Sequence, residues 1–396
     1  MKKVAIVGQG YIGLPLAISA ANSDYYVYGI DIDELKINQL NSGQSPIEGL
    51  SNNEVKTVID KARYIAVNNF EVINECEIVI ICVPTPLNSY HVPDLTAFSN
   101  AVKVVGKHLA KGSLVVIEST IAPGTTRDLV LETLKKESKL SEKDFDLAFS
   151  PERIDPLNPK WNILNTPKIV SGLNENSLNR AVEFYSKFVE KVIGVQSFEV
   201  AETAKVLENS FRLINISFIN ELAVFCNKLG IDINEVIIAA STKPYGFMPF
   251  YPSLGVGGHC IPVDPIYLSE KANQLGTPIQ MIDVASKVNK NMPEYFVGRA
   301  AKKIGGLKDK RVIILGVAYK PNVADVRETP VESLIMGLIS RGAQVSWHDD
   351  LVKQWNGSKS VVLSSNYDLA IIATPHDYFD ISKLGNVPIL NTRGSI

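Results

Sequence analysis

Cysteine and histidine are scarce in this sequence, and their scarcity excludes several kinds of protein. The 396 residues include four cysteines, at positions 76, 82, 226 and 260, with no CxxC spacing and no density typical of a disulfide framework. A reducing, cytoplasmic compartment therefore fits best. The five histidines, at positions 91, 108, 259, 348 and 376, show no ligand spacing, so we expect no metal site.

The sequence also lacks a strong charge of one sign and a long apolar run. A formal net charge of -2 and a pI of about 6.3 provide no global field that would gather nucleic acid or an anionic membrane. No segment approaches the roughly 18 consecutive apolar residues of a membrane span. The apolar run near the N-terminus superficially resembles a secretory signal, but glycines and Pro15 interrupt it, which favours a strand and a turn. We therefore expect neither nucleic acid nor a membrane as a partner.

Short apolar runs alternate with helical stretches at both ends of the chain, which is typical of α/β proteins with parallel sheets. The first thirty residues predict a strand "KVAIVG", a glycine turn, a helix over about 12–22 and a strand "YVYGID" ending in Asp31. Further strands are predicted at "EIVIICVP" and "SLVVIEST". The same order of elements returns as "RVIILGVAYK", "QVSWHDD" and "DLAIIATPH", again with an acidic residue closing the second strand. We therefore predict two Rossmann-like, doubly wound parallel-sheet domains.

The middle of the chain is predicted to be helical. Apolar residues recur there every three or four positions up to the stop signal at Gly230, as in one long helix: Ala204, Leu207, Phe211, Ile214, Phe218, Leu222 and Phe225. A second helical stretch follows over about 279–306. The predicted boundaries are 1–195 for the first Rossmann-like domain, 196–300 for the central helical segment and 301–396 for the second Rossmann-like domain.

The turn "GQGYIG" places Gly8, Gly10 and Gly13 between the first strand and the first helix. This spacing keeps the turn tight, lets the backbone approach a pyrophosphate and lets the helix pack on the sheet. Asp31, at the end of the next strand, can accept hydrogen bonds from ribose hydroxyls and would repel a 2′-phosphate. The motif predicts NAD rather than NADP; the alternative is a glycine turn used only for packing.

One cysteine stands in an unusual setting, the stretch "SLGVGGHCIPVDPIY". A lone cysteine is commonly a small buried hydrophobe. Gly257 and Gly258, however, let the backbone approach a ligand and expose the Cys260 thiol, and Asp264 can orient a partner. The other cysteines lie in strand or helix patterns and are assigned to packing: Cys76, Cys82 and Cys226.

Lys205 and Asn209 are one turn apart on the long predicted helix, beside its apolar stripe. One interpretation is a solvated lysine with Glu202 or Glu208 as a surface partner. The other is a lysine that projects into a cleft, where its cation would stabilise a developing oxyanion.

Polar residues follow several predicted strands. Ser119 and Thr120 end the strand in "IESTIAPGTTRD", and Glu152 follows an apolar run in "FSPERIDPLNP". Asp325 and Arg327 lie at the matching edge of the second half, in "VADVRETP". Ligands bind at the carboxyl ends of parallel strands, so these residues are candidates for a binding site, and turn formation is the alternative.

Together these segments resemble the UDP-glucose/GDP-mannose dehydrogenase family, NAD-dependent enzymes that oxidise a nucleotide-sugar C6 alcohol through an aldehyde to a carboxylate. The resemblance covers nearly the whole chain in order, in "GQGYIGLP", "VPTP", "ESTIAPGTT", "SPERIDP", "AETAKVLENSFR", "GVGGHCIPVDP" and "GVAYKPNVADVRETP". Within the family, "STKPYGFMPFYPSLGVGGHCIPVDPIYL" is most similar to the UDP-N-acetylglucosamine 6-dehydrogenase branch. Ser253 and Leu254 depart from that pattern, which has glycine and proline there.

The resemblance implies covalent catalysis. Cys260, as a thiolate, would attack the aldehyde to form a thiohemiacetal, which a second oxidation converts to a thioester. Lys205 and Asn209 would hold the negative oxygen of each tetrahedral species. Asp264 would orient or help deprotonate the thiol and water system.

Release of the acid requires water. Glu152 and Thr120 resemble the pair that positions this water, with Glu152 as a candidate general base. The resemblance also implies an NAD site lined by Gly8, Gly10, Tyr11, Ile12, Gly13, Asp31, Lys36, Pro84, Thr85, Ser119, Thr120, Glu152 and Arg327. It implies a substrate site lined by Glu152, Arg153, Lys205, Asn209, Phe250, Tyr251, Gly257, Lys320 and Arg393.

The expected partners are a UDP-sugar and a second copy of the chain, since the family uses the long central helix to form a dimer. The sugar is expected to be UDP-N-acetylglucosamine or another UDP-N-acetylhexosamine; the alternatives are UDP-N-acetylmannosamine and UDP-glucose. A two-electron hydroxyacid dehydrogenase also has a helix-borne lysine and asparagine but needs no cysteine. A catalytically silent dinucleotide-binding module is the remaining alternative.

Overall fold

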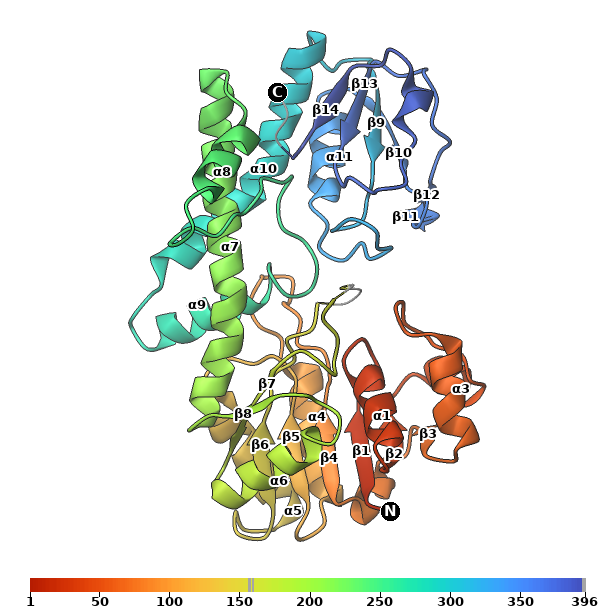
Figure 1. Ribbon diagram of the computed structural model, residues 1–396, viewed down its shortest axis with the longest axis vertical. Helices are drawn as coiled ribbons and strands as arrows, with labels where there is room; N and C mark the ends of the chain where they lie inside the picture. Colours follow the sequence, from red (N-terminus) through yellow and green to blue (C-terminus); the bar gives the residue numbers. More distant parts are fainter. Residues whose placement is uncertain (156–157, 159, 394–396) are drawn as a thin grey trace. The chain divides into compact units, whose positions relative to one another are not determined.

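The computed structural model describes residues 1–155, 158 and 160–393. The chain divides into two compact units, Met1–Leu207 and Glu208–Ile396. The long helix α7, Phe198–Leu229, begins in the first unit and ends in the second (Figure 1). Its end before Gly230, whose φ is 75°, confirms the predicted stop signal. The predicted domain boundaries after residues 195 and 300 stay a prediction.

The first unit is built on an eight-stranded sheet of order β3-β2-β1-β4-β5-β6-β7-β8, in which β7 runs antiparallel to β6 and the other pairs are parallel. The strands are β1 Lys3–Val7, β2 Tyr26–Ile30, β3 Tyr64–Val67, β4 Ile78–Ile81, β5 Leu114–Ile117, β6 Asp146–Phe149, β7 Lys168–Gly172 and β8 Val192–Gly194. The helices are α1 Gly13–Asn22, α2 Glu34–Asn41, α3 Asn52–Asp60, α4 Thr96–His108, α5 Glu132–Ser138 and α6 Glu175–Tyr185, with a 3₁₀ helix η1 Phe70–Glu75 and a π-helix η2 Thr126–Leu131.

Both faces of this sheet are covered. Alternate residues of β1 point to opposite sides, so Val4 and Ile6 join one hydrophobic core with α1 and α6. Ala5 and Val7 join the other core with α4 and α5. A parallel sheet that is buried on both faces exposes its ligand-binding groups only at the carboxyl edge of its strands.

The second unit contains a smaller parallel sheet of order β10-β9-β13-β14. Its strands are β9 Arg311–Leu315, β10 Gln344–His348, β13 Leu369–Ile372 and β14 Ile389–Asn391, with a short hairpin of β11 Gln354–Trp355 and β12 Ser358–Lys359. The helices are α8 Ile233–Ser241, α9 Asp264–Gln274, α10 Gln280–Ile304 and α11 Val331–Ser340, with a short 3₁₀ helix η3 Ile381–Leu384. The predicted fold class, two mainly parallel α/β sheets with a central long helix, is confirmed.

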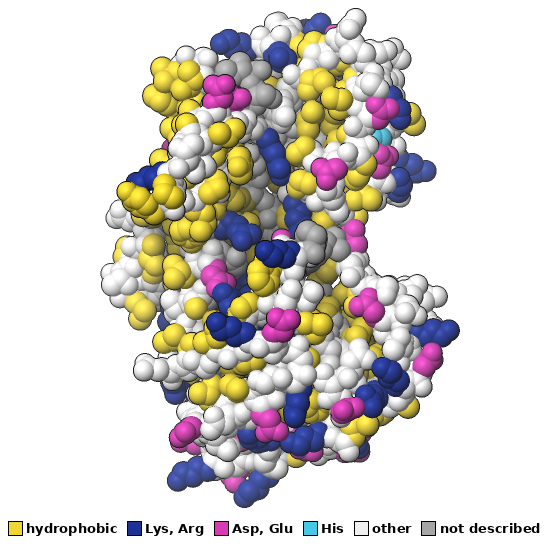
Figure 2. Space-filling view, viewed as in Figure 1, with side chains coloured by type: hydrophobic (Ala, Val, Ile, Leu, Met, Phe, Trp, Pro, Cys, Tyr) yellow, Lys and Arg dark blue, Asp and Glu magenta, His cyan; other side chains and the backbone are white. Residues whose placement is uncertain are grey.

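The apolar stripe predicted on the long helix faces solvent at several positions. Leu207, Phe211, Phe218 and Phe225 are 58%, 47%, 60% and 55% exposed. Figure 2 shows apolar side chains gathered over α7 and α8. In the part of the chain that the structure describes, no helix combines the length and hydropathy needed to cross a membrane.

Candidate functional site

The turn after β1 is shaped by close approaches of backbone. Gly8 has a φ of 95°, and a Cβ there would lie 2.7 Å from the Cys82 carbonyl oxygen. A Cβ on Gly13 would lie 1.8 Å from the Gly8 carbonyl oxygen. Gly10 differs, because its Cβ would meet nothing within 4 Å. Open space therefore lies beside the N-terminus of α1, whose first turn is capped by no side chain among the described residues, a setting that suits an anion.

Asp31 follows β2 and is held by this turn. Its Oδ2 accepts hydrogen bonds from the Gln9 backbone N–H at 2.8 Å and from Lys36 Nζ at 2.8 Å, and its Oδ1 accepts one from the Asp33 N–H at 3.0 Å. Burial raises the pKa of Asp31, but the bonds from Lys36, Gln9 and Asp33 outweigh burial and leave the pKa lowered. A stably charged carboxylate at this position suits ribose hydroxyls and disfavours a 2′-phosphate.

The carboxyl ends of β4 and β5 bring further predicted residues together. Thr85 Oγ1 donates to the Thr120 carbonyl at 2.7 Å, and Ser119 Oγ donates to the Val83 carbonyl at 2.7 Å. Thr85 and Ser119 are buried, whereas Pro84 is exposed and Tyr11 is 38% exposed. These bonds fix the backbone at the edge of the sheet next to the glycine turn.

Glu152 follows β6 and is 8% exposed. Its Oε1 accepts hydrogen bonds from the backbone N–H groups of Arg153 and Ile154, at 2.6 and 2.7 Å. Its Oε2 lies 3.4 Å from Nζ of the buried Lys168. Arg153 Nη1 donates to the Pro167 carbonyl at 2.8 Å. The Glu152 carboxylate is thus held in one orientation by backbone donors and a cation.

Lys205 is buried, at 8% exposed, so the interpretation as a solvated lysine is wrong. Glu202 is no surface partner either: its carboxylate is fully buried and accepts hydrogen bonds from the Gly124 and Thr126 N–H groups at 2.6 and 2.8 Å. Burial raises the pKa of Glu202 despite these bonds. Glu202 instead ties α7 to the loop after β5, which keeps the turn carrying Lys205 close to that strand end.

Cys260 is exposed, and the other three cysteines are buried, as predicted. The chain turns at Cys260 into α9, since its carbonyl accepts hydrogen bonds from the Val263 and Asp264 N–H groups at 3.3 and 2.8 Å. Asp264 is 3% exposed, and its Oδ2 accepts a hydrogen bond from Asn209 Nδ2 at 2.6 Å. The structure therefore joins two residues that the sequence placed far apart, next to the backbone that carries the thiol.

The glycines before Cys260 have a packing role that the sequence did not reveal. A Cβ on Gly257 would lie 2.6 Å from the Glu328 carbonyl oxygen, and a Cβ on Gly258 would lie 2.8 Å from the Tyr319 ring. The Gly258 N–H also donates to the Arg327 carbonyl at 3.0 Å. The cysteine loop thus packs closely on the segment that follows β9, which is a physical reason for these glycines besides an approach to a sugar.

Other predicted residues lie in varied settings. Arg327 forms an ion pair with Asp325 at 2.5 Å. Phe250 packs edge-on against Phe211 of α7, with ring centroids 5.7 Å apart, whereas Tyr251 is 53% exposed. Lys320 Nζ lies 5.7 Å from the Tyr319 ring centroid.

His259 and Arg393 have pKa values lowered by burial. For His259 the nearby Arg327 cation adds to the effect, which favours a neutral imidazole. For Arg393 the Asp377 carboxylate opposes it. The described residues contain no group of three or more His, Cys, Asp or Glu side chains arranged to hold a metal.

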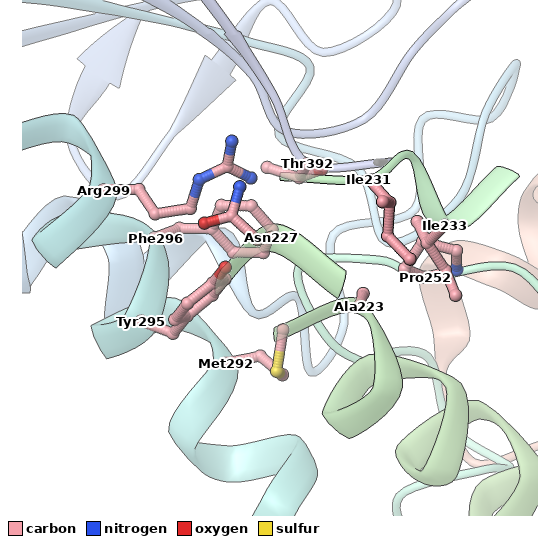
Figure 3. Close-up of a pocket in the computed structure, with 10 residues that line it drawn as sticks. All are labelled: Ala223, Asn227, Ile231, Ile233, Pro252, Met292, Tyr295, Phe296, Arg299 and Thr392. Carbon is pink, nitrogen blue, oxygen red and sulfur yellow. The ribbon is translucent and has the colours of Figure 1, made fainter. Parts of the chain in front are cut away.

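A pocket in the second unit contains none of the predicted site residues (Figure 3). It is lined by Ala223, Asn227, Ile231, Ile233, Pro252, Met292, Tyr295, Phe296, Arg299 and Thr392. Figure 3 shows the Arg299 guanidinium pointing toward Asn227 and Thr392. In the first unit, a second pocket is lined by Glu152, Arg153 and Lys168, among others.

Sequence reasoning missed the buried charges behind Glu152. Glu118 and Lys168 are 0% and 5% exposed, and Tyr185 donates its hydroxyl hydrogen to Glu118. A charged residue inside an otherwise apolar strand pattern, as in "SLVVIEST" and "TPKIVSG", was the available signal.

Comparison with known proteins gives consistent matches along the chain. The description "UDP-glucose/GDP-mannose dehydrogenase family" covers all three matched models: the NAD binding domain over residues 2–189, the central domain over 199–291 and the UDP binding domain over 313–393. UDP-N-acetyl-D-glucosamine 6-dehydrogenase of Salmonella typhi is 36% identical over 395 residues, which covers 95% of this chain and 90% of that protein.

Two further relatives are named for a different sugar. UDP-N-acetyl-D-mannosamine dehydrogenase of Methanococcus maripaludis is 34% identical over 397 residues, covering 98% of this chain and 89% of that protein. The solved structure of UDP-D-ManNAc dehydrogenase from Pyrococcus horikoshii has a TM-score of 0.91 at 30% identity, covering 99% of this chain and 95% of that one.

Proposed function

Because this chain belongs to the UDP-glucose/GDP-mannose dehydrogenase family, and is therefore an NAD-dependent nucleotide-sugar dehydrogenase, we propose that it oxidises a UDP-sugar C6 alcohol to the acid in two steps. The observation that carries this proposal is the exposed Cys260, whose backbone turns directly into the bonded pair of Asp264 and Asn209. A two-electron hydroxyacid dehydrogenase has no use for such a thiol.

Cys260 is the proposed nucleophile. The first oxidation removes a hydride and a proton from the alcohol and leaves an aldehyde. The Cys260 thiolate then adds to the aldehyde carbon, whose oxygen takes up a proton to give a thiohemiacetal, and loss of a second hydride and of that proton leaves a thioester. Bound NAD supplies the hydride acceptor for each oxidation. This role needs a free thiol, which agrees with the predicted reducing, cytoplasmic compartment.

Lys205 and Asn209 are the proposed oxyanion donors. They lie one turn apart on α7, and Lys205 is buried, so its cation would act in a low-dielectric setting where such donors are worth several kcal/mol of barrier, about 3–4 each. The bond from Asn209 to Asp264 gives the Asn209 amide a fixed orientation. Asp264 is in turn proposed to orient or help deprotonate the thiol and water system.

Glu152 is the proposed general base for hydrolysis, with Thr120 helping to position the water. The water oxygen adds to the thioester carbon as its proton passes to Glu152, and the carbon–sulfur bond then breaks with its electron pair left on Cys260 Sγ. Two backbone N–H donors orient the carboxylate for this task.

The proposed NAD site follows the turn after β1 and the neighbouring strand ends. Gly10 leaves room for the pyrophosphate, Gly8 and Gly13 allow the close backbone packing that forms the turn, and Asp31 with Lys36 suits the ribose. Thr85 and Ser119 hold the adjoining backbone. The other residues proposed for the NAD site are Tyr11, Ile12, Pro84, Thr120, Glu152 and Arg327, and those proposed for the substrate site are Glu152, Arg153, Lys205, Asn209, Phe250, Tyr251, Gly257, Lys320 and Arg393.

UDP-N-acetylglucosamine is the sugar that we propose first. The name of the Salmonella typhi relative and the resemblance of the cysteine loop support it. UDP-N-acetylmannosamine is the second candidate, because relatives of similar identity and coverage carry that name.

The test measures NADH formed per sugar consumed, with UDP-N-acetylglucosamine, its manno and galacto epimers and UDP-glucose supplied in turn. Two NADH per sugar on one of them is the expected result. Cys260→Ser should keep NAD affinity and lose acid formation by at least about a thousandfold, as expected for a missing nucleophile. Cys226→Ser, which changes a buried thiol of α7, is the matched control. Full acid formation by Cys260→Ser would contradict the covalent route.

We also propose a homodimer through α7. The exposed Leu207, Phe211, Phe218 and Phe225 form a stripe along one helix, and a second copy of the same stripe is its natural cover. Light scattering of Phe218→Glu is expected to give the mass of one chain, against two for the unaltered protein. An unchanged mass for the variant would show that another surface holds the copies together.

A further inference from the structure

A buried cluster of charges lies behind Glu152 in the first unit. It consists of Glu118, which follows β5, Lys168, which opens β7, and Tyr185, at the end of α6. Glu118 and Tyr185 are 0% exposed, Lys168 is 5% exposed and Glu152 is 8% exposed. Moving ionised groups out of water costs several kcal/mol each, so this cluster is expensive unless its charges are well paired.

The pairing runs in a chain that ends at Glu152. Tyr185 donates its hydroxyl hydrogen to Glu118 Oε1, and the Lys168 ammonium lies 4.9 Å from the Tyr185 ring centroid. Lys168 Nζ lies 3.2 Å from Glu118 Oε2 and 3.4 Å from Glu152 Oε2. Among the described residues Glu118 Oε2 has no well-aligned donor, so its attraction to Lys168 is that of an ion pair. One ammonium thus serves two carboxylates.

Strand direction explains how Lys168 reaches this position. β7 runs antiparallel to β6, with Phe149 opposite Ser171. The first residue of β7 therefore lies at the edge where β5 and β6 end, which is the edge that binds ligands in a parallel sheet. A parallel strand would have placed its first residue at the opposite edge. Lys168 is thus a buried cation at the carboxyl ends of β5 and β6.

We propose that Lys168 is a positioning residue for Glu152, pairing with its carboxylate and orienting it as a base, and that Glu118 moderates this by sharing the ammonium. This inference rests on the proposed role of Glu152 in hydrolysis. With both carboxylates ionised, one ammonium faces two negative charges, so the cluster carries one excess negative charge.

The electrostatics of the neighbours agree with this geometry. Burial would lower the pKa of Lys168, but Glu118 and Glu152 outweigh burial and leave it raised, so the ammonium stays charged. Burial raises the pKa of Glu118, with Glu152 adding to the effect and Lys168 and Tyr185 opposing it. Burial also keeps the pKa of the nearby Cys82 well above its usual range, so this thiol stays neutral.

A small pocket beside the cluster is suited to water. Glu152, Arg153, Thr166 and Lys168 are among its lining residues, and it has room for about one water molecule. The buried Thr166 Oγ1 has no hydrogen-bond partner in the described part of the chain. A buried hydroxyl without a partner is costly, and a water bonded to it would also reach the polar groups of this pocket.

The experiment separates hydrolysis from the oxidations by rapid mixing of enzyme, NAD and UDP-sugar. Slow hydrolysis gives a burst of two NADH per active site followed by a slower steady rate. Lys168→Met is expected to keep the burst and NAD affinity but to slow the steady rate by about tenfold to a hundredfold, less than the roughly 10²–10⁴-fold expected for losing the base itself. Lys168→Arg should restore most of the rate, and the exposed Lys187→Met should behave as the unaltered enzyme.

The pH dependence of the steady rate gives a second readout. The charged or titratable groups facing Glu152 are Lys168, Glu118, Tyr185, Cys82 and Arg153. Without the ammonium, Glu118 repels the Glu152 charge, so Lys168→Met should move the acid limb of the profile to higher pH. Glu118→Gln leaves the whole ammonium to Glu152 and should move the limb to lower pH. Limbs that do not move, or that move the same way, would overturn the proposal.

Folding and the prior proposal are controlled separately. If Lys168→Met fails to fold, the pair Lys168→Met with Glu118→Gln removes one charge of each sign; it should keep the burst and lose steady rate by about tenfold or more. A full steady rate in that pair, or equal slowing of burst and steady rate in either variant, would mean that Lys168 is only structural. An unaltered enzyme that forms no acid would instead refute the proposed function, whatever the variants do.

Discussion

The two Rossmann-like sheets begin with the same backbone turn and differ in what they do with it. Gly8 and Gly316 each follow the first strand with positive φ, 95° and 80°, and each donates its N–H to the end of the second strand, to Ile30 and His348. A Cβ on either would strike a carbonyl oxygen of a neighbouring strand end, at 2.7 and 2.2 Å. The glycine turn is therefore required by strand packing in both sheets, and a ligand site needs further features beside it.

The acidic residue after the second strand of each sheet has different hydrogen-bond partners in the two halves. Asp31 and Asp349 both accept a hydrogen bond from the residue after the glycine, Gln9 or Val317, at 2.8 and 3.0 Å. Asp349 is fully buried and also accepts bonds from the Leu351 and Val352 N–H groups. Asp349 thus has three backbone N–H donors, whereas Asp31, which is 8% exposed, has two backbone N–H donors and the Lys36 ammonium.

In the second half, a buried histidine also bonds to Asp349. His376 Nδ1 accepts the Asn322 N–H at 2.8 Å, so Nε2 carries the hydrogen that is donated to Asp349 Oδ2 at 3.1 Å. The next position of the turn differs as well. Gly10 leaves open space, whereas its counterpart Ala318 is fully buried. The same turn thus has open space beside its third residue in the first half and a fully buried third residue in the second.

The largest expected effect comes from removing the Asp349 carboxylate. Asp349→Ala should lower the free energy of unfolding by about 3–5 kcal/mol, because it leaves a buried histidine donor and backbone N–H groups without an acceptor. NAD affinity should not change. Urea unfolding followed by circular dichroism measures the loss, with the exposed Asp350→Ala as control. Equal stability of both variants would show that Asp349 is not the anchor of this sheet.

Acid tests the same carboxylate without a large change of shape. Burial raises the pKa of Asp349, but the His376 bond and the Val317 and Val352 N–H groups lower it to about 2, below its ordinary value of 3.8. The stabilisation is complete above the unfolded pKa and is lost as pH falls from about 4 to 2, on the order of 2 kcal/mol. Asp349→Asn should lack this part of the acid dependence, which urea midpoints at several pH values measure.

A smaller effect is expected at Asp31, and it should appear in NAD binding rather than in folding. Asp31→Ala should lower the affinity for NAD by about 10–100-fold, because a hydrogen bond to a charged group is worth about 1.5–3 kcal/mol. It should also reduce the ratio of the NAD affinity to the NADP affinity. Titration calorimetry measures both affinities, with Asp349→Ala as the reciprocal control. An unchanged ratio of the two affinities would mean that Asp31 does not bind the ribose hydroxyls.

Patterns over short stretches of chain predicted seven strands, the glycine turn, the long helix and the exposed Cys260, because these depend on neighbouring residues. The strands are β1, β2, β4 and β5 of the first sheet and β9, β10 and β13 of the second. The burial of Lys205 was left open, since a helix period shows which residues share a face and not what covers that face. The buried partners of Glu152 were missed, because Glu118 and Lys168 meet it only through the order and direction of β5, β6 and β7.

The sequence by itself determined the fold class, the family and NAD as cofactor, because glycine spacing, apolar period and ordered motifs are written in local chain chemistry. Only the tertiary structure decided which side chain pairs with each of the two matching acidic residues, Lys36 with Asp31 and His376 with Asp349. It also decided that one buried ammonium sits between two carboxylates. Both outcomes depend on which strand ends lie side by side, and an antiparallel strand brings to one edge residues that no local pattern relates.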